Sequence, residues 1–504
     1  MKSEHPLWRG ALILTAAGFA SRLIGFFYRI FLSQAIGAEG VGLYQLVFPV
    51  YATAFSLTAS GIQTAISRHV SARIARKDHA GARNILSAGL ILSFGLSLAC
   101  ALIVNVQADF IAVHLLMEPR CASLLRIIAW AAPFGCIHSC LHGYFYALKR
   151  ADVPALSQLI EQLSRIAASY LIFCLFLEKG LTPTPILAAG GMVAGELVST
   201  FFTVGAFLFR EKPLSGRRIF PDSQAFSSIF SMAAPLTLNR TMLNLLHSVE
   251  AACIPWQLQR YGLTSSEALS LYGVLTGMAM PLVLFPSAIT NALSTMLLPS
   301  VSEDLSLDKT DNIRRTVERT IGSSLWLGIF CTGAFLLTGE KLGNLLFHSP
   351  EVGPFILVLA WLCPFLYLGA TMTSILNGMG KTLLTFFQHM ASLILRILFV
   401  CFAIPVYGIL GYLWGMLASE LLLSFLTLVS LYRGLHFQIQ FRSWIICPCA
   451  AMTVSAGVYL FFTSLLNLLE SHTAFSLPEM IGLILNGSLM AACFFFFMYQ
   501  IHDE

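Results

Sequence analysis

Apolar runs of about twenty residues or more recur along the whole chain, and they limit the folds that it can adopt. An α-helix of that length crosses roughly 30 Å of hydrocarbon with its backbone groups hydrogen-bonded internally. A β-barrel is excluded, because barrel strands alternate polar and apolar residues. With 57% hydrophobic and 11% charged residues, the 504-residue chain also falls outside the range of water-soluble domains. We therefore expect an all-α, polytopic membrane protein.

The apolar runs predict 14 transmembrane helices, and their ends are defined to within a few residues. The predicted spans are 10–36, 42–66, 84–108, 123–148, 154–177, 186–209, 225–256, 268–298, 320–340, 353–379, 383–404, 408–432, 443–468 and 478–500.

The basic residues predict how the chain is oriented. With a cytoplasmic N-terminus, 20 of the 30 Lys and Arg residues lie inside, 5 lie outside and 5 lie within spans. Cytoplasmic loops carry such an excess of basic residues. We therefore expect a multi-pass membrane protein with both termini in the cytoplasm. The net charge of +5 then reflects topology and contact with anionic membrane lipids, so nucleic acid is not an expected partner.

An internal repeat relates the two halves of the chain. When the sequence is aligned with itself at a shift of 231 residues, one group of residues in the first half matches residues in the second half. A loop is shorter in the second half, and beyond it a shift of 224 residues aligns Glu196 with Glu420. The pairs at the first shift are Ala129 with Ala360, Trp130 with Trp361, Pro133 with Pro364, Phe134 with Phe365 and Arg165 with Arg396. An even number of spans separates these positions, so the repeats are parallel.

The repeat predicts three parts of the chain: an N-terminal six-helix lobe at 1–215, a C-terminal six-helix lobe at 222–434 and an additional helix pair at 442–504. Transporters built from two such halves bind their cargo near the middle of the membrane and expose it to each side in turn. The longest predicted loop, 299–319, resembles a solvated surface helix and not a catalytic domain. We therefore expect a transporter, no enzyme, and no resident cofactor or metal.

Five arginines lie within the predicted spans, where each costs roughly 3 kcal/mol at the bilayer centre. Two of them, Arg22 and Arg29, lie within about 20° of each other around the first span. That face can meet an anionic substrate. For Arg29, the alternative is a side chain that extends to the outer headgroups.

The span at 225–256 carries a polar stripe. Arg240, Asn244 and His247 lie on one face, and Glu250 follows within a turn. Such a stripe is expected to face a cavity, although Arg240 also fits an interfacial position. Glu250, with His247 and Asn244, is a candidate site for a coupling ion, either Na⁺ or a proton. The alternative is a structural ion pair with another helix.

Among the remaining charges in the spans, the glutamates and Arg165 favour structural roles, whereas Arg396 does not. Glu161 and Arg165 are four residues apart, so an ion pair within one helix can satisfy both. Arg396 has no acid at that spacing and is expected to be the freer cation, with a place beside the substrate. The repeat-related Glu196 and Glu420 lie among small residues that suit tight helix packing.

The arginines indicate the chemistry of the cargo. A guanidinium presents forked donors that fit phosphate, and it repels cations. Arg22, Arg29, Arg240 and Arg396 therefore predict a site for an anionic diphosphate. A lipid that carries a diphosphate-linked sugar fits, because it already lies in the membrane. An inside-negative potential also assists its outward movement, by about 2.3 kcal/mol per charge per 100 mV.

Several segments resemble the multidrug/oligosaccharidyl-lipid/polysaccharide exporter (MOP) superfamily. The first span is similar to a Ser-Arg-x-x-Gly-Phe…Arg pattern of this superfamily, in residues 21–29. Segments 57–67, 271–281 and 297–302 resemble its stage V sporulation protein B branch. That branch is similar to the lipid II flippases of the MurJ type, which implies roles in polysaccharide or peptidoglycan biosynthesis. The resemblance places Arg22 and Arg29 at the diphosphate, and Glu250 where relatives carry an acid.

Three functions remain open at this point. The first is a flippase that moves an undecaprenyl-diphosphate-linked precursor from the inner to the outer leaflet, driven by Na⁺, protons or the membrane potential. The second is a cation-coupled multidrug exporter of the same superfamily. The third is an accessory of cell-wall synthesis that transports nothing. Under each of the three hypotheses, the enzymes of cell-wall synthesis are candidate partners. Five arginines against four glutamates within the spans favour an anionic cargo.

Overall fold

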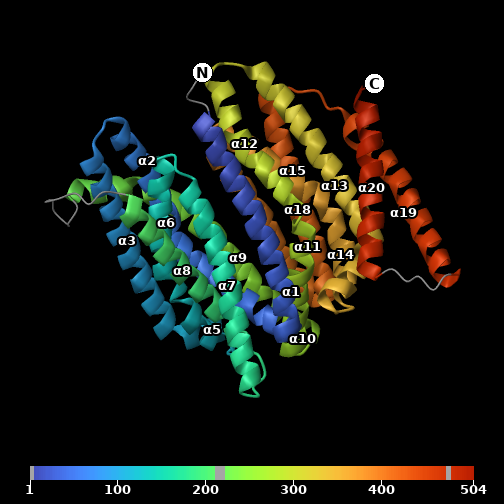
Figure 1. Ribbon diagram of the computed structural model, residues 1–504, viewed down its shortest axis with the longest axis horizontal. Coiled ribbons are helices and arrows are strands. Elements are labelled where there is room, and N and C mark those ends of the chain that lie inside the picture. Colours follow the sequence, from blue (N-terminus) through green and yellow to red (C-terminus); the bar gives the residue numbers. More distant parts are fainter. Residues whose placement is uncertain (1–4, 211–221, 473–477, 504) are drawn as a thin grey trace. The chain divides into compact units, whose positions relative to one another are not determined.

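The computed structural model describes residues 5–210, 222–472 and 478–503. These residues form helices and short connections, and no strand occurs among them (Figure 1). The predicted all-α membrane fold is confirmed. By the packing of its backbone the chain divides into an N-terminal unit, residues 1–273, and a C-terminal unit, residues 274–504. The predicted lobes were defined by the internal sequence repeat and not by packing, so that division stays a prediction.

In the described ranges, 12 helical segments are long and apolar enough to cross a membrane, so the count of fourteen is not confirmed. Two differences account for the smaller number. The first segment, Ile13–Ala75, runs through both of the first two predicted spans. The predicted span 225–256 is not among the twelve, although it lies in a helix of 39 residues. The polar stripe of that helix lowers its hydropathy.

The N-terminal unit contains ten α-helices in the described part of the chain. They are α1 (His5–Phe55), α2 (Gly61–Ala75), α3 (His79–Val106), α4 (Ala108–Phe110), α5 (Cys121–Ile128), α6 (Ala131–Ala147), α7 (Asp152–Glu178), α8 (Ile186–Arg210), α9 (Ser223–Tyr261) and α10 (Ser265–Gly273). Two π-helical turns, η1 (Ser56–Ser60) and η2 (Ile111–Leu115), interrupt them.

Gly37 divides α1 into the first two predicted spans. Its backbone angles, φ 69° and ψ 176°, are non-helical, and a left-handed φ of this kind suits glycine. The helix therefore bends at the boundary that the sequence predicted between residues 36 and 42. Further along the unit, α2, α3, α6 and α9 share one apolar core that includes Ile66, Ile85, Leu141 and Ile229.

The C-terminal unit contains a further ten α-helices in the described residues. They are α11 (Met280–Leu284), α12 (Ser287–Ser306), α13 (Thr310–Phe347), α14 (Val352–Leu359), α15 (Cys363–Gly378), α16 (Thr382–Phe402), α17 (Ile404–Tyr407), α18 (Ile409–Leu435), α19 (Cys447–His472) and α20 (Glu479–Asp503). Shorter helical turns are η3 (Val274–Ala279), η4 (Ala360–Leu362) and η5 (Arg442–Ile446).

Two separate cores hold this unit together. Helices α12, α13, α15 and α18 pack around residues such as Val301, Ile321, Met372 and Leu431. The terminal pair, α19 and α20, packs on itself and on α13 through a second core that includes Phe494. The two units share one irregularity at positions that the repeat relates. The α-helical backbone breaks at Ala129–Trp130 and again at the repeat-related Ala360–Trp361.

A polar network joins three segments of the N-terminal unit. The guanidinium of Arg120 donates to Glu118 at 2.7 Å and to Glu39 at 2.6 Å, and the hydroxyl of Ser265 donates to Glu118 at 2.7 Å. Burial alone would raise the pKa of Glu118, but the bonds from Arg120 and Ser265 hold that pKa below its ordinary value. The network therefore connects the bend of α1 to the start of α10.

Helices α7 and α8 approach closely because two glycines face the contact. A Cβ on Gly191 would lie 1.9 Å from the Oγ of Ser169, and one on Gly195 would lie 2.9 Å from the carbonyl oxygen of Glu161. The small residues around Glu196 thus allow the tight packing that the sequence predicted. As a consequence, the polar side chains of α7 and α8 lie beside each other.

We predict that Gly191→Ala destabilises the protein by about 1–3 kcal/mol, because the added methyl group overpacks the α7–α8 contact. Gly205→Ala is the matched control, since nothing lies within 4 Å of the added atom on the same helix. Thermal unfolding of the two purified variants in one detergent provides the comparison. Equal unfolding temperatures would contradict the close-contact account.

Candidate functional site

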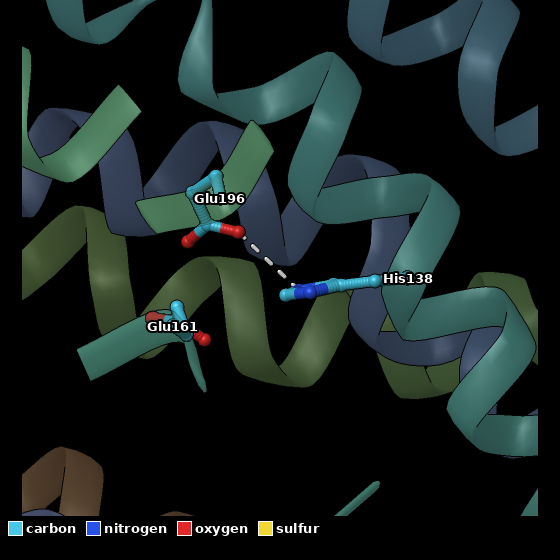
Figure 2. A group of neighbouring side chains, drawn as sticks. All are labelled: His138, Glu161 and Glu196. Atoms are coloured by element: carbon cyan, nitrogen blue, oxygen red, sulfur yellow. Dashed lines mark ion pairs between the residues drawn. The ribbon is translucent and has the colours of Figure 1, made fainter. Parts of the chain in front are cut away.

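A buried polar cluster lies where α6, α7 and α8 meet. His138 comes from α6, Glu161 and Arg165 from α7, and Glu196 from α8. Figure 2 shows His138, Glu161 and Glu196 turned toward one another, with an ion pair drawn between His138 and Glu196. One donor atom from each of these three residues lies within 4.8 Å of the other two. We call these four side chains the α6–α8 cluster.

The acids of the α6–α8 cluster have specific partners. The Tyr51 hydroxyl donates to Oε1 of Glu196 at 3.0 Å, and Nε2 of His138 lies 3.3 Å from Oε2 of the same carboxylate. Glu161 forms the predicted ion pair with Arg165. His138 and Glu196 are only 6% and 5% exposed. His138 and Glu196 are therefore shielded from solvent, Glu161 and Arg165 are half-buried, and three helices and α1 hold the cluster.

A chain of hydroxyl groups fixes the other side of the His138 ring. Nδ1 of His138 lies 2.8 Å from Oγ of Ser199, which lies 2.7 Å from Oγ of Ser157. Ser157 in turn lies 2.9 Å from Oγ1 of Thr203, whose hydroxyl donates to the carbonyl oxygen of Ser199. All three hydroxyl residues are fully buried. The chain thus joins α6, α7 and α8 behind the cluster.

Three of the predicted arginines lie in the N-terminal unit and carry no ion pair to a carboxylate within the described residues: Arg22, Arg29 and Arg240. Arg22 is exposed and Arg29 is half-buried on α1. Arg240 is exposed on α9, and its guanidinium donates to the carbonyl oxygen of Ser60 at 3.4 Å. The positive charge of all three is therefore available to an anion.

The rest of the α9 stripe has mixed surroundings. Asn244 donates to the carbonyl oxygen of Ala52 at 3.3 Å, so this part of the stripe contacts α1. His247 is half-exposed, and its Nδ1 lies 3.3 Å from Oε2 of Glu250. Glu250 itself is 5% exposed. Of the three candidate coupling residues, Asn244 thus lies at a helix contact, His247 is partly exposed and Glu250 is buried.

Arg396 is not the freer cation that we expected. Its guanidinium lies 3.8 Å from the carboxylate of Glu420, and both side chains are 14% exposed. The partner comes from a different helix, α18, so spacing along α16 could not reveal it. This contact is between the Arg and Glu positions that the repeat relates to Arg165 and Glu196.

His138 was missed by the sequence analysis. A lone histidine in an apolar helix is usually a packing residue, and nothing within α6 marks it as special. The usable signal was the tight α7–α8 packing, which brings Glu161 beside Glu196 and leaves room for a third polar group. The sequence predicted Glu161 and Arg165 as an ion pair and Glu196 as a packing residue, but it did not predict that they form one cluster.

Comparison with known proteins gives the family. The family described as Polysaccharide biosynthesis protein matches residues 7–304, and the family described as MatE matches residues 258–402. The chain belongs to the polysaccharide biosynthesis protein family. Stage V sporulation protein B of Bacillus subtilis (strain 168) is 29% identical over 475 residues, which cover 91% of each chain. Lipid II flippase MurJ of the same organism is 24% identical, over 75% of this chain and 74% of that protein.

Solved structures show the same fold. Lipid II flippase MurJ in an inward closed conformation has a TM-score of 0.73 at 14% identity, over 98% of this chain and 99% of that chain. A multidrug resistance MATE family transporter of the MOP superfamily, inward-facing, has a TM-score of 0.68 at 15% identity, over 82% and 94%. By family and fold, this chain of the polysaccharide biosynthesis family is a MOP-superfamily transporter and not an enzyme.

We predict that Arg165→Met lowers the stability of this transporter by about 1–3 kcal/mol, because it leaves the half-buried Glu161 without its counter-charge. Adding Glu161→Gln to that variant should restore part of the loss, since it removes the uncompensated charge. Arg22→Met is the matched control and should cost little. Thermal unfolding of the full-length variants measures all three. A double variant that is less stable than Arg165→Met alone would refute the pairing.

Proposed function

We propose that this transporter is a flippase for an undecaprenyl-diphosphate-linked precursor, either peptidoglycan lipid II or a polysaccharide unit. It moves this lipid from the inner to the outer leaflet of the bacterial cytoplasmic membrane by alternating access. The polysaccharide biosynthesis family and the flippase relative support a lipid-linked oligosaccharide as the cargo. Both termini lie in the cytoplasm in this proposal, as the distribution of basic residues predicts.

One observation carries the proposal. Arg22, Arg29 and Arg240 have no carboxylate partner within the described residues, although a charge in hydrocarbon needs a counter-charge. A diphosphate supplies that counter-charge and accepts the forked donors of a guanidinium. Arg22 and Arg29 lie on one face of α1 and are the principal diphosphate ligands, and Arg240 of α9 is a further ligand in this proposal. Arg396 belongs to the C-terminal unit, where Glu420 already supplies a counter-charge.

We predict that Arg22→Ala with Arg29→Ala reduces outward movement of precursor by about tenfold or more, because charge-assisted bonds to phosphate are lost. The assay is complementation of cells depleted of their own lipid II flippase, with outer-leaflet precursor measured directly. The matched pair Arg22→Lys with Arg29→Lys keeps the charge but not the fork, and should retain partial activity.

Each outcome of this assay has one meaning when the variants are present in the membrane at equal amounts. A double alanine variant that moves precursor as well as the wild type would remove the diphosphate role. A wild-type protein that moves no precursor would refute this cargo. Export of cationic drugs in its place would establish a multidrug exporter, and absence of both activities would favour an accessory of cell-wall synthesis enzymes.

The buried Glu250, with His247 and Asn244, is our proposed site for a coupling ion on α9. We predict that Glu250→Gln abolishes the dependence of transport on Na⁺ or on pH, because the amide carries no charge for the ion to neutralise. Transport should be measured with each gradient imposed separately across proteoliposomes. A variant that keeps the wild-type ion dependence would leave the membrane potential, or another site, as the driving element.

A further inference from the structure

The hydroxyl chain behind His138 determines which ring nitrogen carries hydrogen. The Thr203 hydroxyl donates to a carbonyl oxygen, so Ser157 must donate to Thr203. Ser199 then donates to Ser157 at 2.7 Å, since its 3.5 Å contact with the Ser157 carbonyl oxygen is much longer. The hydrogen between Ser199 and the imidazole must therefore come from Nδ1 of His138, which donates at 2.8 Å.

This assignment leaves Nε2 of a neutral His138 without hydrogen. Nε2 then lies 3.3 Å from Oε2 of Glu196, and two acceptors at that distance repel each other. Oε2 of Glu196 has no hydrogen-bond partner among the described residues, and Glu196 is 5% exposed. One added proton removes the conflict, because it can lie on Nε2 or on the carboxylate and join the two.

The charges around the pair lead to the same conclusion. Glu161 and Arg165 of α7 face it, Tyr51 of α1 contacts Glu196, and the ring of His142 stacks on His138 with centroids 5.0 Å apart. Arg29 of α1 lies close enough to Arg165 for the two positive charges to interact electrostatically. Two carboxylates and Arg165 leave one negative charge when His138 is neutral. One positive charge makes the α6–α8 cluster neutral.

A metal ion fits this cluster poorly, although the donor spacing would admit one. Hard cations prefer oxygen ligands, whereas His138 offers nitrogen. The transition metals that accept imidazole carry two charges, which would leave the cluster positive beside the Arg165 guanidinium. A proton has the required charge and needs only two acceptor atoms, and Nε2 and Oε2 lie 3.3 Å apart.

We infer that His138 and Glu196 form a proton-binding site that takes up a single proton between Nε2 and Oε2. This site is separate from Glu250 on α9. That its proton is exchanged during transport rests on the proposed function, whereas the binding itself does not. In the proposed flippase, the occupancy of this site sets the charge of the helix contact at α6–α8, whereas the coupling ion binds at Glu250.

The first experiment is infrared difference spectroscopy of the full-length protein in lipid nanodiscs, titrated from acid to alkaline pH. We expect Glu196→Gln and His138→Gln each to remove one titrating proton from the wild-type spectrum. Glu420→Gln, which changes the repeat-related acid, is the matched control and should retain that proton. Persistence of the full wild-type titration in both cluster variants would overturn the inference.

The same titration separates a proton from a metal ion. When the titration is repeated in the presence of Na⁺ or Zn²⁺, the wild-type protein should still take up the proton. If either ion abolishes this uptake in the wild type at stoichiometric amounts, the cluster is a cation site and the inference fails. Should the wild type titrate as expected but move no precursor, the proton site stands and the proposed function fails.

A second measurement does not depend on the folding of the cluster variants. Nitrogen NMR of histidine-labelled wild-type protein should show His138 protonated at Nδ1 at alkaline pH and at both nitrogens when the proton is bound. Ser199→Ala removes the acceptor and should abolish the preference for Nδ1. A wild-type His138 that carries its only hydrogen on Nε2 at alkaline pH would overturn the inference, because the ring would already donate to Glu196.

Discussion

A charge within hydrocarbon requires a counter-charge, and this constraint sorts the polar groups of the transporter. Arg165 is paired with Glu161, and Arg396 lies 3.8 Å from Glu420. The close approach of α7 and α8 at their glycines is what brings Glu161 and Glu196 together. The arginines without a carboxylate partner in the described chain are then the ones that an anionic cargo would neutralise. Structure and proposed function thus follow from one electrostatic requirement.

Much of the fold could be predicted because membrane helices are specified locally. Length and hydropathy identified the helices, and the bend at Gly37 falls between two predicted spans. The helix α9 is a borderline case, since the apolar runs predicted a span at 225–256 but its polar stripe keeps it out of the twelve helices that are apolar enough to cross a membrane. The Glu161–Arg165 pair was predictable for the same local reason, because helix geometry places residues i and i+4 together.

Pairing between helices was harder to predict. The partner of Arg396 lies on another helix, and its identity depends on the register between α16 and α18. His138 became informative only when α8 placed Glu196 and Ser199 on the two sides of its ring. Two kinds of polar site therefore emerge in the N-terminal unit: unpaired arginines that we propose for a diphosphate, and a compact acid–imidazole cluster that we propose for a proton.

The most direct test of the central claim is selective binding of a diphosphate lipid by the unpaired arginines. Native mass spectrometry of the full-length protein can compare undecaprenyl diphosphate with uncharged undecaprenol. The account predicts that the wild type retains the diphosphate lipid preferentially and that Arg22→Ala with Arg29→Ala loses this preference. Equal retention of the two lipids by the wild type would contradict it.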